Sequence, residues 1–338
     1  MKLMSSISPA GSRISRKRLP GLLLLLLGSV LPLQAVADKA VPASEIKVIQ
    51  KLIFERKMAE AAPRLDAAIE NYPDSGRLAF LLGQLYYFSN IPNYPKAVAA
   101  YDKAEPMLSK DSELYFFRAA AKAQVLSAYS QRLRPDYSGA LADYRKAEAL
   151  GSERDLRLDI ARTLYETRDY PAALEQINRY LNNKPQLWAD GQMLKGNILA
   201  QMGQHEAALK SYKRAARQYD YLDKLQFYQA VSLRALGRSD EALAQLDKGL
   251  KRQGRAYFQL VYLKAMLSYE QKQYQEAALL YQQLIERRRG WALPLLGYYN
   301  SLSQMGEGPI SISHILDLAL ELDPEVVIHF HQQDLLRL

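Results

Sequence analysis

The sequence predicts an all-α fold, a solenoid of about eight helix-turn-helix repeats followed by a C-terminal capping helix. The first reason is a recurrent Ala, which returns at steps of 33 to 43 residues through most of the chain. A bulky residue follows it four positions later and a further apolar or small residue three positions after that, so that each set lies on one helical face. The second reason is composition: 49% hydrophobic and 24% charged residues among 338 suffice for a large core and exclude collagen, disordered tails and polytopic membrane proteins.

Residues 1–37 are expected to form a cleaved signal peptide. Five cations and no acid precede or flank the apolar run from Leu19 to Leu33, and Ala35 and Ala37 supply the small residues of a cleavage site. The alternative is an uncleaved inner-membrane anchor, but the run is shorter than the roughly 20 residues of a membrane-spanning helix. The mature chain would then begin at Asp38 and reside in the periplasm of a diderm bacterium, with no stable membrane span.

Charge and cysteine content exclude several functions. The formal net charge of +9 comes from 45 cations and 36 acids, and removal of the five cations of the leader leaves 40 cations against 36 acids, or +4. A mildly basic exported chain does not favour nucleic-acid binding. The remaining basic clusters recur at predicted helix ends, where cations oppose the helix dipole, and a phosphate-binding stripe is the less favoured alternative. Zero Cys excludes disulfides, a thiol nucleophile and zinc-thiolate sites.

Seven units carry the repeated pattern in their second helix. The Ala position is Ala61, Ala97, Ala140, Ala173, Ala208, Ala242 and Ala277. The bulky position is Leu65, Tyr101, Tyr144, Ile177, Tyr212, Leu246 and Tyr281. The third position is Ala68, Ala104, Ala147, Tyr180, Ala215, Gly249 and Leu284, of which Tyr180 and Leu284 break the preference for small residues. An upstream aromatic stands three residues before the Ala in four units: Tyr94, Tyr137, Tyr170 and Tyr274.

The first helix of each unit has its own small residue. It is Gly83, Gly196 or Gly297 in three units and Ala161, Ala230 or Ala265 in three others. A Gly inside a helix is unfavourable by about 1 kcal/mol, so its presence predicts a close approach by a neighbouring helix. Pro73, Pro185 and Pro324 fall just after second helices, where Pro cannot continue the helix.

Together these features resemble the tetratricopeptide repeat family, with Leu-Gly in the first helix, Ala and Tyr in the second and a terminal Pro. The strongest local matches are residues 203–212 and 273–281, and a divergent eighth unit has Ile312 in place of the Ala. The resemblance implies a right-handed superhelix over residues 38–324, with first helices lining a concave groove. The apolar tail, residues 325–338, is expected to be the capping helix that covers the open end.

Departures from the family pattern point to longer loops. The first-helix Trp is absent in most units, since Trp188 and Trp291 only flank the first helices of the fifth and eighth. Extra residues around 127–136 lengthen the third unit, and residues 90–93 and 306–309 lengthen the turns of the second and eighth. Tyr outnumbers Phe by 23 to 8, and most of these Tyr residues are expected to pack between helices.

No catalytic or metal-binding motif stands out. The sequence has neither a phosphate-binding Gly-rich loop nor a H-E-x-x-H or calcium-loop pattern. The spacing of His329 and His331 points them to different faces of a helix, and the cluster of Ser311, Ser313, His314 and Asp317 is better explained by helix capping than by a hydrolytic triad. The sequence therefore predicts no enzyme activity, no metal and no cofactor.

The leading hypothesis is a periplasmic scaffold that binds a protein or peptide partner in its groove. The resemblance implies cell-envelope assembly, secretion or exopolysaccharide export, and a solenoid that guides a carbohydrate polymer is the alternative. Two positions of the first helices commonly face the groove in the family, which gives these candidate partner-binding residues: Gln84, Tyr87, Arg162, Tyr165, Asn197, Arg234, Met266, Tyr269 and Tyr298. Arg and Asn can hold a carboxylate or a peptide backbone, and Tyr can cover apolar side chains. The competing interpretation is that Arg162 and Arg234 pair with neighbouring acids such as Asp159 and Glu166.

Overall fold

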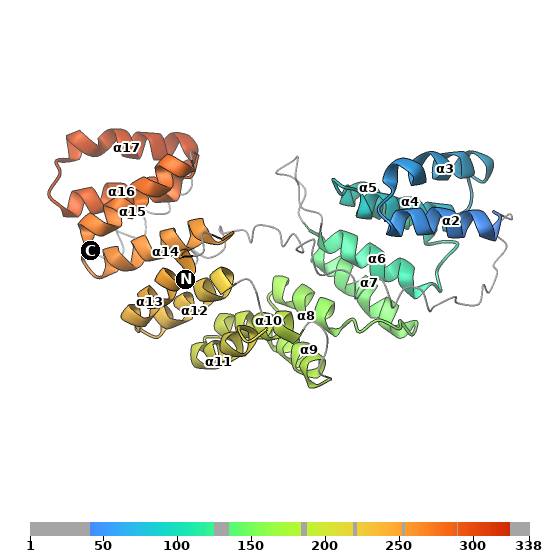
Figure 1. The fold of residues 1–338 in the computed structure, drawn as a ribbon, viewed down its shortest axis with the longest axis horizontal. Helices are drawn as coiled ribbons and strands as arrows, with labels where there is room; N and C mark the ends of the chain where they lie inside the picture. The colour runs from blue at the N-terminus through green and yellow to red at the C-terminus, as the bar shows by residue number, and fades with distance from the viewer. Residues whose placement is uncertain are drawn as a thin grey trace. The chain divides into compact units, whose positions relative to one another are not determined.

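A computed structural model describes residues 41–324, except 125–134, 184–187, 219–221, 252–253 and 289. These described residues form sixteen helices and no strand (Figure 1), which confirms the all-α prediction. The predicted leader, the tail with His329 and His331, and most of the insertion in the third unit lie outside the described residues. Cleavage of the leader and capping by residues 325–338 therefore stay predictions.

The helices form eight consecutive pairs, each consisting of a first helix, here called helix A, and a second helix, helix B. The four N-terminal pairs are α2 (Ala43–Phe54) with α3 (Met58–Asn71), α4 (Gly76–Phe88) with α5 (Tyr94–Ala104), α6 (Ser112–Ala123) with α7 (Tyr137–Ala149), and α8 (Arg157–Glu166) with α9 (Tyr170–Asn182). The four C-terminal pairs are α10 (Trp188–Gln201) with α11 (His205–Ala215), α12 (Leu222–Ala235) with α13 (Ser239–Leu250), α14 (Tyr257–Glu270) with α15 (Tyr274–Arg287), and α16 (Ala292–Gln304) with α17 (Pro309–Leu322).

The chain divides into two compact units. The N-terminal unit is Met1–Arg168, which contains α2 to α8, and the C-terminal unit is Asp169–Leu338, which contains α9 to α17. The boundary falls between the two helices of the fourth pair. Each unit is described by itself below.

The repeated positions of helix B form the core of the first seven repeats. All seven residues at the Ala position are 0% exposed, and the seven bulky residues are at most 4% exposed. The third position is buried in all seven units, and it includes Tyr180, Leu284 and Gly249. The periodicity in the sequence is thus the periodicity of the buried face.

The Gly residues of helix A make room for aromatic rings of helix B. An ideal Cβ added at Gly83 would lie 2.3 Å from Cε1 of Tyr101, and one at Gly196 would lie 2.3 Å from Cε1 of Tyr212. These are pairs within one repeat. A Cβ at Gly297 would lie 2.3 Å from Cζ of Tyr281, which belongs to the preceding repeat, so the divergent eighth unit uses its Gly differently.

A left-handed residue ends helix A in six repeats. Gly203, Gly237 and Gly306 have positive φ, and so do three non-Gly residues, Arg56, Arg168 and Lys272. The following backbone N–H reaches back to the last turn of helix A, as in the 2.8 Å bonds from Gln204 to Leu199 and from Gln273 to Ser268. These bonds satisfy carbonyl groups that would otherwise be orphaned at the helix end. In other repeats, Asn93 and Asp136 side chains cap helix B.

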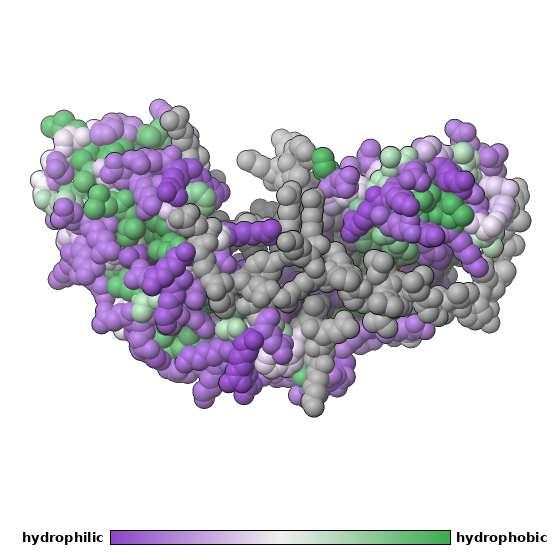
Figure 2. All heavy atoms as spheres, viewed as in Figure 1, coloured by the Kyte–Doolittle hydropathy of each residue, from purple (hydrophilic) through white to green (hydrophobic). Residues whose placement is uncertain are grey.

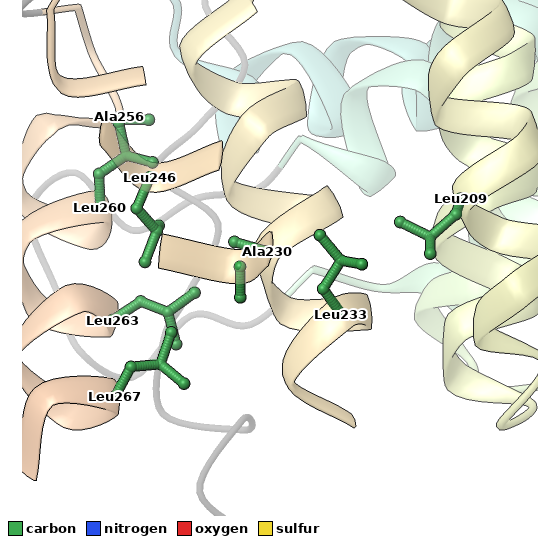
Figure 3. Close-up of a cluster of buried hydrophobic side chains, with 9 residues drawn as sticks. Leu209, Ala230, Leu233, Leu246, Ala256, Leu260, Leu263 and Leu267 are labelled. Carbon is green, nitrogen blue, oxygen red and sulfur yellow. The ribbon is translucent and has the colours of Figure 1, made fainter. Parts of the chain in front are cut away.

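The core is continuous between neighbouring repeats of the C-terminal unit (Figure 3). One cluster joins side chains from α11, α12, α13 and α14: Leu209, Ala230, Leu233, Ala242, Leu246, Ala256, Leu260, Leu263 and Leu267. At the end of the described chain, α17 exposes Ile310 to 92% and Leu318 to 45%, and Figure 2 shows hydrophobic side chains over this part of the surface. An apolar tail that covers α17 remains our proposal for residues 325–338.

Candidate partner-binding face

The A helices of the C-terminal unit lie next to one another. Helix α10 contacts α12, α12 contacts α14, and α14 contacts α16, because the repeats stack with their A helices on the same side. Five of the candidate residues lie on these four helices: Asn197, Arg234, Met266, Tyr269 and Tyr298. We call the surface formed by these four A helices the A-helix face.

The main polar feature of the A-helix face is an ion pair between consecutive repeats. The Nε of Arg234 on α12 donates to Oε2 of Glu270 on α14 at 3.0 Å, and its Nη2 also reaches this carboxylate. Hydrogen bonding to Glu270 raises the pKa of Arg234, although burial opposes the shift, so the guanidinium stays charged. The two side chains are 35% and 42% exposed, which leaves them accessible and limits their contribution to stability.

Several tyrosines belong to the same repeats as this ion pair. Burial raises the pKa of Tyr262 to about 12, and the positive charge of Arg234 opposes the shift. The Tyr262 ring centroid lies 5.9 Å from that of Tyr281 and 5.1 Å from that of Trp291. Tyr269 packs edge-on against Tyr274 at 5.3 Å. These rings are amphipathic, with an apolar body and a polar hydroxyl.

The other three candidates of this unit are partly buried. Met266 packs against the core of the seventh repeat, and Tyr298 packs against the cores of the seventh and eighth. The Oδ1 of Asn197 accepts a 2.9 Å hydrogen bond from the hydroxyl of Tyr212, the ring that occupies the space beside Gly196. Asn197 therefore has an intrarepeat role whatever else it binds.

The N-terminal unit contains the remaining candidates, and it buries one of them. Gln84 is 1% exposed, so we leave it out of the proposed surface as a correction to the predicted set. Tyr87 is partly buried, and its ring lies 5.6 Å from Tyr94 and 6.0 Å from Phe117, within an aromatic cluster. Burial raises its pKa well above the ordinary value.

Arg162 and Tyr165 lie on α8, and Arg162 is exposed. Its Nη1 is 3.7 Å from Oδ1 of Asp159, which agrees with the competing interpretation that it pairs with a nearby acid. Arg162 belongs to the N-terminal unit, whereas Asn197 and Arg234 belong to the other. Arg234, Met266, Tyr269 and Tyr298 thus lie on neighbouring A helices, and their joint role in binding, like their grouping with Arg162, stays a prediction.

The functional candidates that the sequence did not reveal are Glu270 and Tyr262. Glu270 is 36 residues from Arg234, and only the stacking of two repeats brings them together. The sole signal in the sequence is that Arg234 and Glu270 both lie near the C-terminal ends of successive A helices. Arg234 does pair with an acid, as the competing interpretation held, but the acid comes from the next repeat.

The largest group of charges has a structural role in the N-terminal unit. Arg118 is 6% exposed and bonds three carboxylates, with Oδ1 of Asp143 at 2.7 Å, Oε2 of Glu105 at 2.5 Å and Oδ1 of Asp102 at 3.0 Å. Hydrogen bonding by Arg118 lowers the pKa of Glu105 to about 2, against the effect of desolvation. Because Arg118 and Asp143 are buried and link α5, α6 and α7, their role is to stabilise the stack.

The polar residues that could suggest catalysis or metal binding have local roles in the described part of the chain. The hydroxyls of Ser311 and Ser313 donate to the carbonyls of Gly308 and Ile310 at 2.7 and 3.1 Å. The predicted capping role is wrong, because Gly308 is the N-cap of α17 and no side chain caps this helix. Within residues 41–324, less the gaps given above, no group of three or more His, Asp or Glu is placed to hold a metal ion. None of the described helices is both long and apolar enough to cross a membrane.

Comparison with known proteins gives a consistent result. The sequence profile described as tetratricopeptide repeat matches residues 52–112, 158–223 and 228–292, more than half of the chain. No curated protein matches the sequence.

Several solved structures share the fold. A tetratricopeptide repeat protein from Parabacteroides merdae ATCC 43184 is 16% identical with a TM-score of 0.55, and the match covers 82% of this chain and 98% of that one. The apo form of the quorum sensor NprR from B. thuringiensis is 17% identical with a TM-score of 0.61, covering 82% and 86%. PilW, described as a type IV pilus biogenesis factor, is 12% identical with a TM-score of 0.52, covering 64% and 97%. At these identities the likeness shows the fold alone.

Proposed function

Because this chain belongs to the tetratricopeptide repeat family, whose fold is generally a non-catalytic scaffold for protein interactions, we propose that it is a non-enzymatic scaffold that binds a polypeptide partner. The observation that carries the proposal is the half-exposed Arg234–Glu270 ion pair in its setting of tyrosines on the A-helix face. A surface that combines aromatic rings, Met and Arg has the composition of a protein interface core.

The chemistry of this face suits a peptide backbone and its side chains. The exposed part of the Arg234 guanidinium still offers N–H donors, and the exposed part of the Glu270 carboxylate still offers acceptors. The pair can therefore donate to the carbonyl groups and accept from the N–H groups of an extended segment. Tyr269, Met266 and Tyr298 are half-buried, and their exposed parts can cover apolar side chains of the partner without losing their own packing.

The location and pathway of the scaffold belong to the same proposal. The basic, apolar and small-residue segments of residues 1–37 support export to the periplasm. A periplasmic scaffold would serve cell-envelope assembly, secretion or exopolysaccharide export. The similarity in fold to PilW is compatible with envelope work, but it does not select a pathway.

The alternative function, guidance of a carbohydrate polymer, requires open ring faces for stacking on sugars. Tyr298 and the adjacent Tyr299 are the half-buried rings nearest the end of the A-helix face, and they are the feature that favours it. The two functions make different demands: a polymer would need these rings, whereas a peptide would need the Arg234–Glu270 pair.

Site-specific crosslinking tests the A-helix face in the native host. A photo-reactive phenylalanine analogue in place of Tyr269 should capture a polypeptide that mass spectrometry can identify. The matched control carries the same analogue in place of Leu279, which is 62% exposed on α15, a helix B. It should not capture the polypeptide that is captured from position 269. The captured partner is then purified and titrated against variants.

The decisive variant reverses the ion pair, with Arg234→Glu and Glu270→Arg in one chain. The reversal retains an attraction between repeats, so the melting temperature should barely change, because an exposed pair contributes roughly 0–1 kcal/mol. If the pair binds the partner, affinity should fall about tenfold or more, since misplaced charges at an interface are unfavourable. Unchanged affinity would show that the pair only joins repeats. Loss of affinity on Tyr298→Ala alone, with polysaccharide rather than protein captured, would favour the alternative.

A further inference from the structure

A second surface of the C-terminal unit lies where each helix B ends and the next helix A begins. The N-termini of two A helices meet at this edge, because Oδ2 of Asp223 at the start of α12 accepts a 2.8 Å hydrogen bond from the backbone N–H of Ala256, just before α14. The C-terminus of α15 reaches the same place, since Nε2 of Gln283 donates to the hydroxyl of Tyr257 at 2.7 Å. Successive repeats therefore present their helix ends side by side.

Two arginines at this edge rest on aromatic rings. The Cζ of Arg287 lies 5.1 Å from the ring centroid of Tyr257, and the Cζ of Arg288 lies 5.9 Å from that of Phe258 and 5.2 Å from that of Trp291. Both arginines are exposed. A guanidinium held over a ring keeps its N–H groups directed outward, and less conformational freedom remains to be lost when it binds an anion.

The acids near this edge are occupied elsewhere. Asp223 is 6% exposed and serves the Ala256 backbone, Asp247 lies 3.0 Å from Nζ of Lys264, and Glu286 accepts from Gln282 at 3.1 Å. In the described part of the chain, no carboxylate lies within ion-pair distance of Arg287 or Arg288, which contrasts with the partners found for Arg118, Arg154 and Arg234. Arg287 and Arg288 thus carry positive charges that no described carboxylate pairs.

The helix dipole explains only part of this arrangement. Cations are favoured near the C-terminal end of any helix, and Arg287 lies in the last turn of α15. The dipole does not require that two consecutive arginines stack on three different rings.

We propose that this surface binds an acidic segment of a polypeptide partner. It comprises Lys251, Arg287 and Arg288 with the rings of Tyr257, Phe258 and Trp291, and we call it the basic edge. The two stacked guanidinium groups are free to form charge-assisted hydrogen bonds with Asp or Glu carboxylates. The inference goes beyond the A-helix face, and it shares with the proposed function only the premise that the partner is a polypeptide.

Other polyanions fit this edge less well. The three rings are half-buried and each has a guanidinium over it, so they lack the open faces on which sugars or nucleic-acid bases stack. The exposed large apolar side chains of the described residues lie elsewhere, none of them between 248 and 258 or between 284 and 292. A membrane surface would therefore find cations here but nothing to insert.

The test uses the purified chain and a fluorescent peptide of alternating Glu and Gly, with a Gln–Gly peptide as the neutral probe. The acidic peptide should bind, measured by fluorescence anisotropy, and binding should weaken several-fold between about 50 and about 200 mM salt. Arg287→Gln with Arg288→Gln should lower the affinity about tenfold. The Arg287→Lys, Arg288→Lys variant should bind the acidic peptide with an affinity between those of the original protein and the double Gln variant, because Lys keeps the charge but loses the planar, bidentate geometry.

The matched control removes two cations from the opposite end of the same helices, with Arg238→Gln and Lys272→Gln. If the control variant lost as much affinity for the acidic peptide as the Arg287→Gln, Arg288→Gln variant, only the net charge of the protein would matter, and the proposal would be overturned. Trp291 gives a local readout in a Trp188→Phe background, where its fluorescence should change with the acidic peptide and not with the neutral one. Tighter binding of a polyuronate, single-stranded DNA or anionic vesicles, with the same dependence on Arg287 and Arg288, would overturn the assignment of a polypeptide. Loss of partner binding on reversal of Arg234 and Glu270 leaves this test unaffected.

Discussion

The substitution Gly83→Ala measures how closely two helices of one repeat must approach. The added Cβ would lie 2.3 Å from Cε1 and 2.5 Å from Cδ1 of Tyr101, whose side chain is fully buried. Ordinary contacts between carbon atoms are about 3.5–4.0 Å, so the ring or the helix must move by more than about 1 Å. Overpacking of this kind costs roughly 1–3 kcal/mol. Gly→Ala in an unobstructed helix would instead stabilise by about 1 kcal/mol.

A second variant identifies the cause of the loss. In the sixth repeat the same two positions hold Ala230 and Leu246, and both are 0% exposed, so an Ala fits where a Leu replaces the ring. Tyr101→Leu should therefore rescue Gly83→Ala. We expect the free energy of unfolding of the double variant to exceed, by about 1–3 kcal/mol, the value obtained by adding the effects of the two single substitutions. This is the usual range of coupling between residues in contact.

The assay must resolve one repeat, because a repeat array need not unfold in a single step. Native-state hydrogen exchange of amides in α4 and α5 reports the local opening free energy, and urea denaturation gives the overall stability. Gly308→Ala is the control for a methyl group added in open space, since a Cβ there has nothing within 4 Å; any loss at this N-cap should be the small cost of replacing Gly by Ala at a cap and should stay in α17. A Gly83→Ala protein that is as stable as the original, or single effects that simply add, would refute the argument from close approach.

Four further outcomes follow from the structure. Ala208→Trp, at a 0% exposed position, should lose about 1–3 kcal/mol of stability in thermal denaturation, and no loss would mean that the repeat register is wrong. Lys272→Gly should gain roughly 0.5–1 kcal/mol, because φ is 62° there and Gly adopts the left-handed region without strain. Arg118 is the main cause that lowers the pKa of Glu105 to about 2. The contribution of Glu105 to stability is therefore complete above the ordinary carboxyl pKa and should fade as the pH drops from about 4.5 toward 2. Glu105→Gln should flatten the curve of stability against pH in this range. Mass spectrometry of the protein from its native host should show a chain that begins at Asp38, and an intact leader would contradict export by cleavage.

The repeat framework could be predicted from the sequence because its determinants are local and periodic. Ala97 and Tyr101, or Ala208 and Tyr212, are four residues apart, so the spacing on one helix already places them on one face. Every repeat supplies an independent instance of the same packing problem, and the buried fractions agree throughout. The lengthened turns after α4 and α16 follow from the same register, since the positions on either side of them fix where the helices end.

The binding surfaces could not be predicted to the same degree, because they depend on which residues of neighbouring repeats meet. Arg234 was expected on the A-helix face, but its partner Glu270 comes from the next repeat. Gln84 occupies a position that commonly faces the groove in the family, yet it is 1% exposed. The basic cluster at residues 287–289 was assigned to the helix dipole, since the sequence does not show that Tyr257, Phe258 and Trp291 lie beneath its side chains.

Three arginines show how the same residue type acquires different roles in one stack. The side chain of Arg118 is 7% exposed and bonds three carboxylates, of which Asp143 is also 7% exposed, and removal of Arg118 leaves that buried acid with Lys122 as its remaining cation, which destabilises the stack. Arg234 is 35% exposed with one carboxylate, so it can join repeats and still bind a partner. Arg288 is exposed on two rings, and among the described residues it has no carboxylate. The supply of nearby carboxylates, rather than the number of cations in the sequence, therefore decides which positive charges remain for another molecule. By this criterion, changes at Arg118 should act on stability, changes at Arg288 on binding, and changes at Arg234 on binding once the ion pair is restored in reverse.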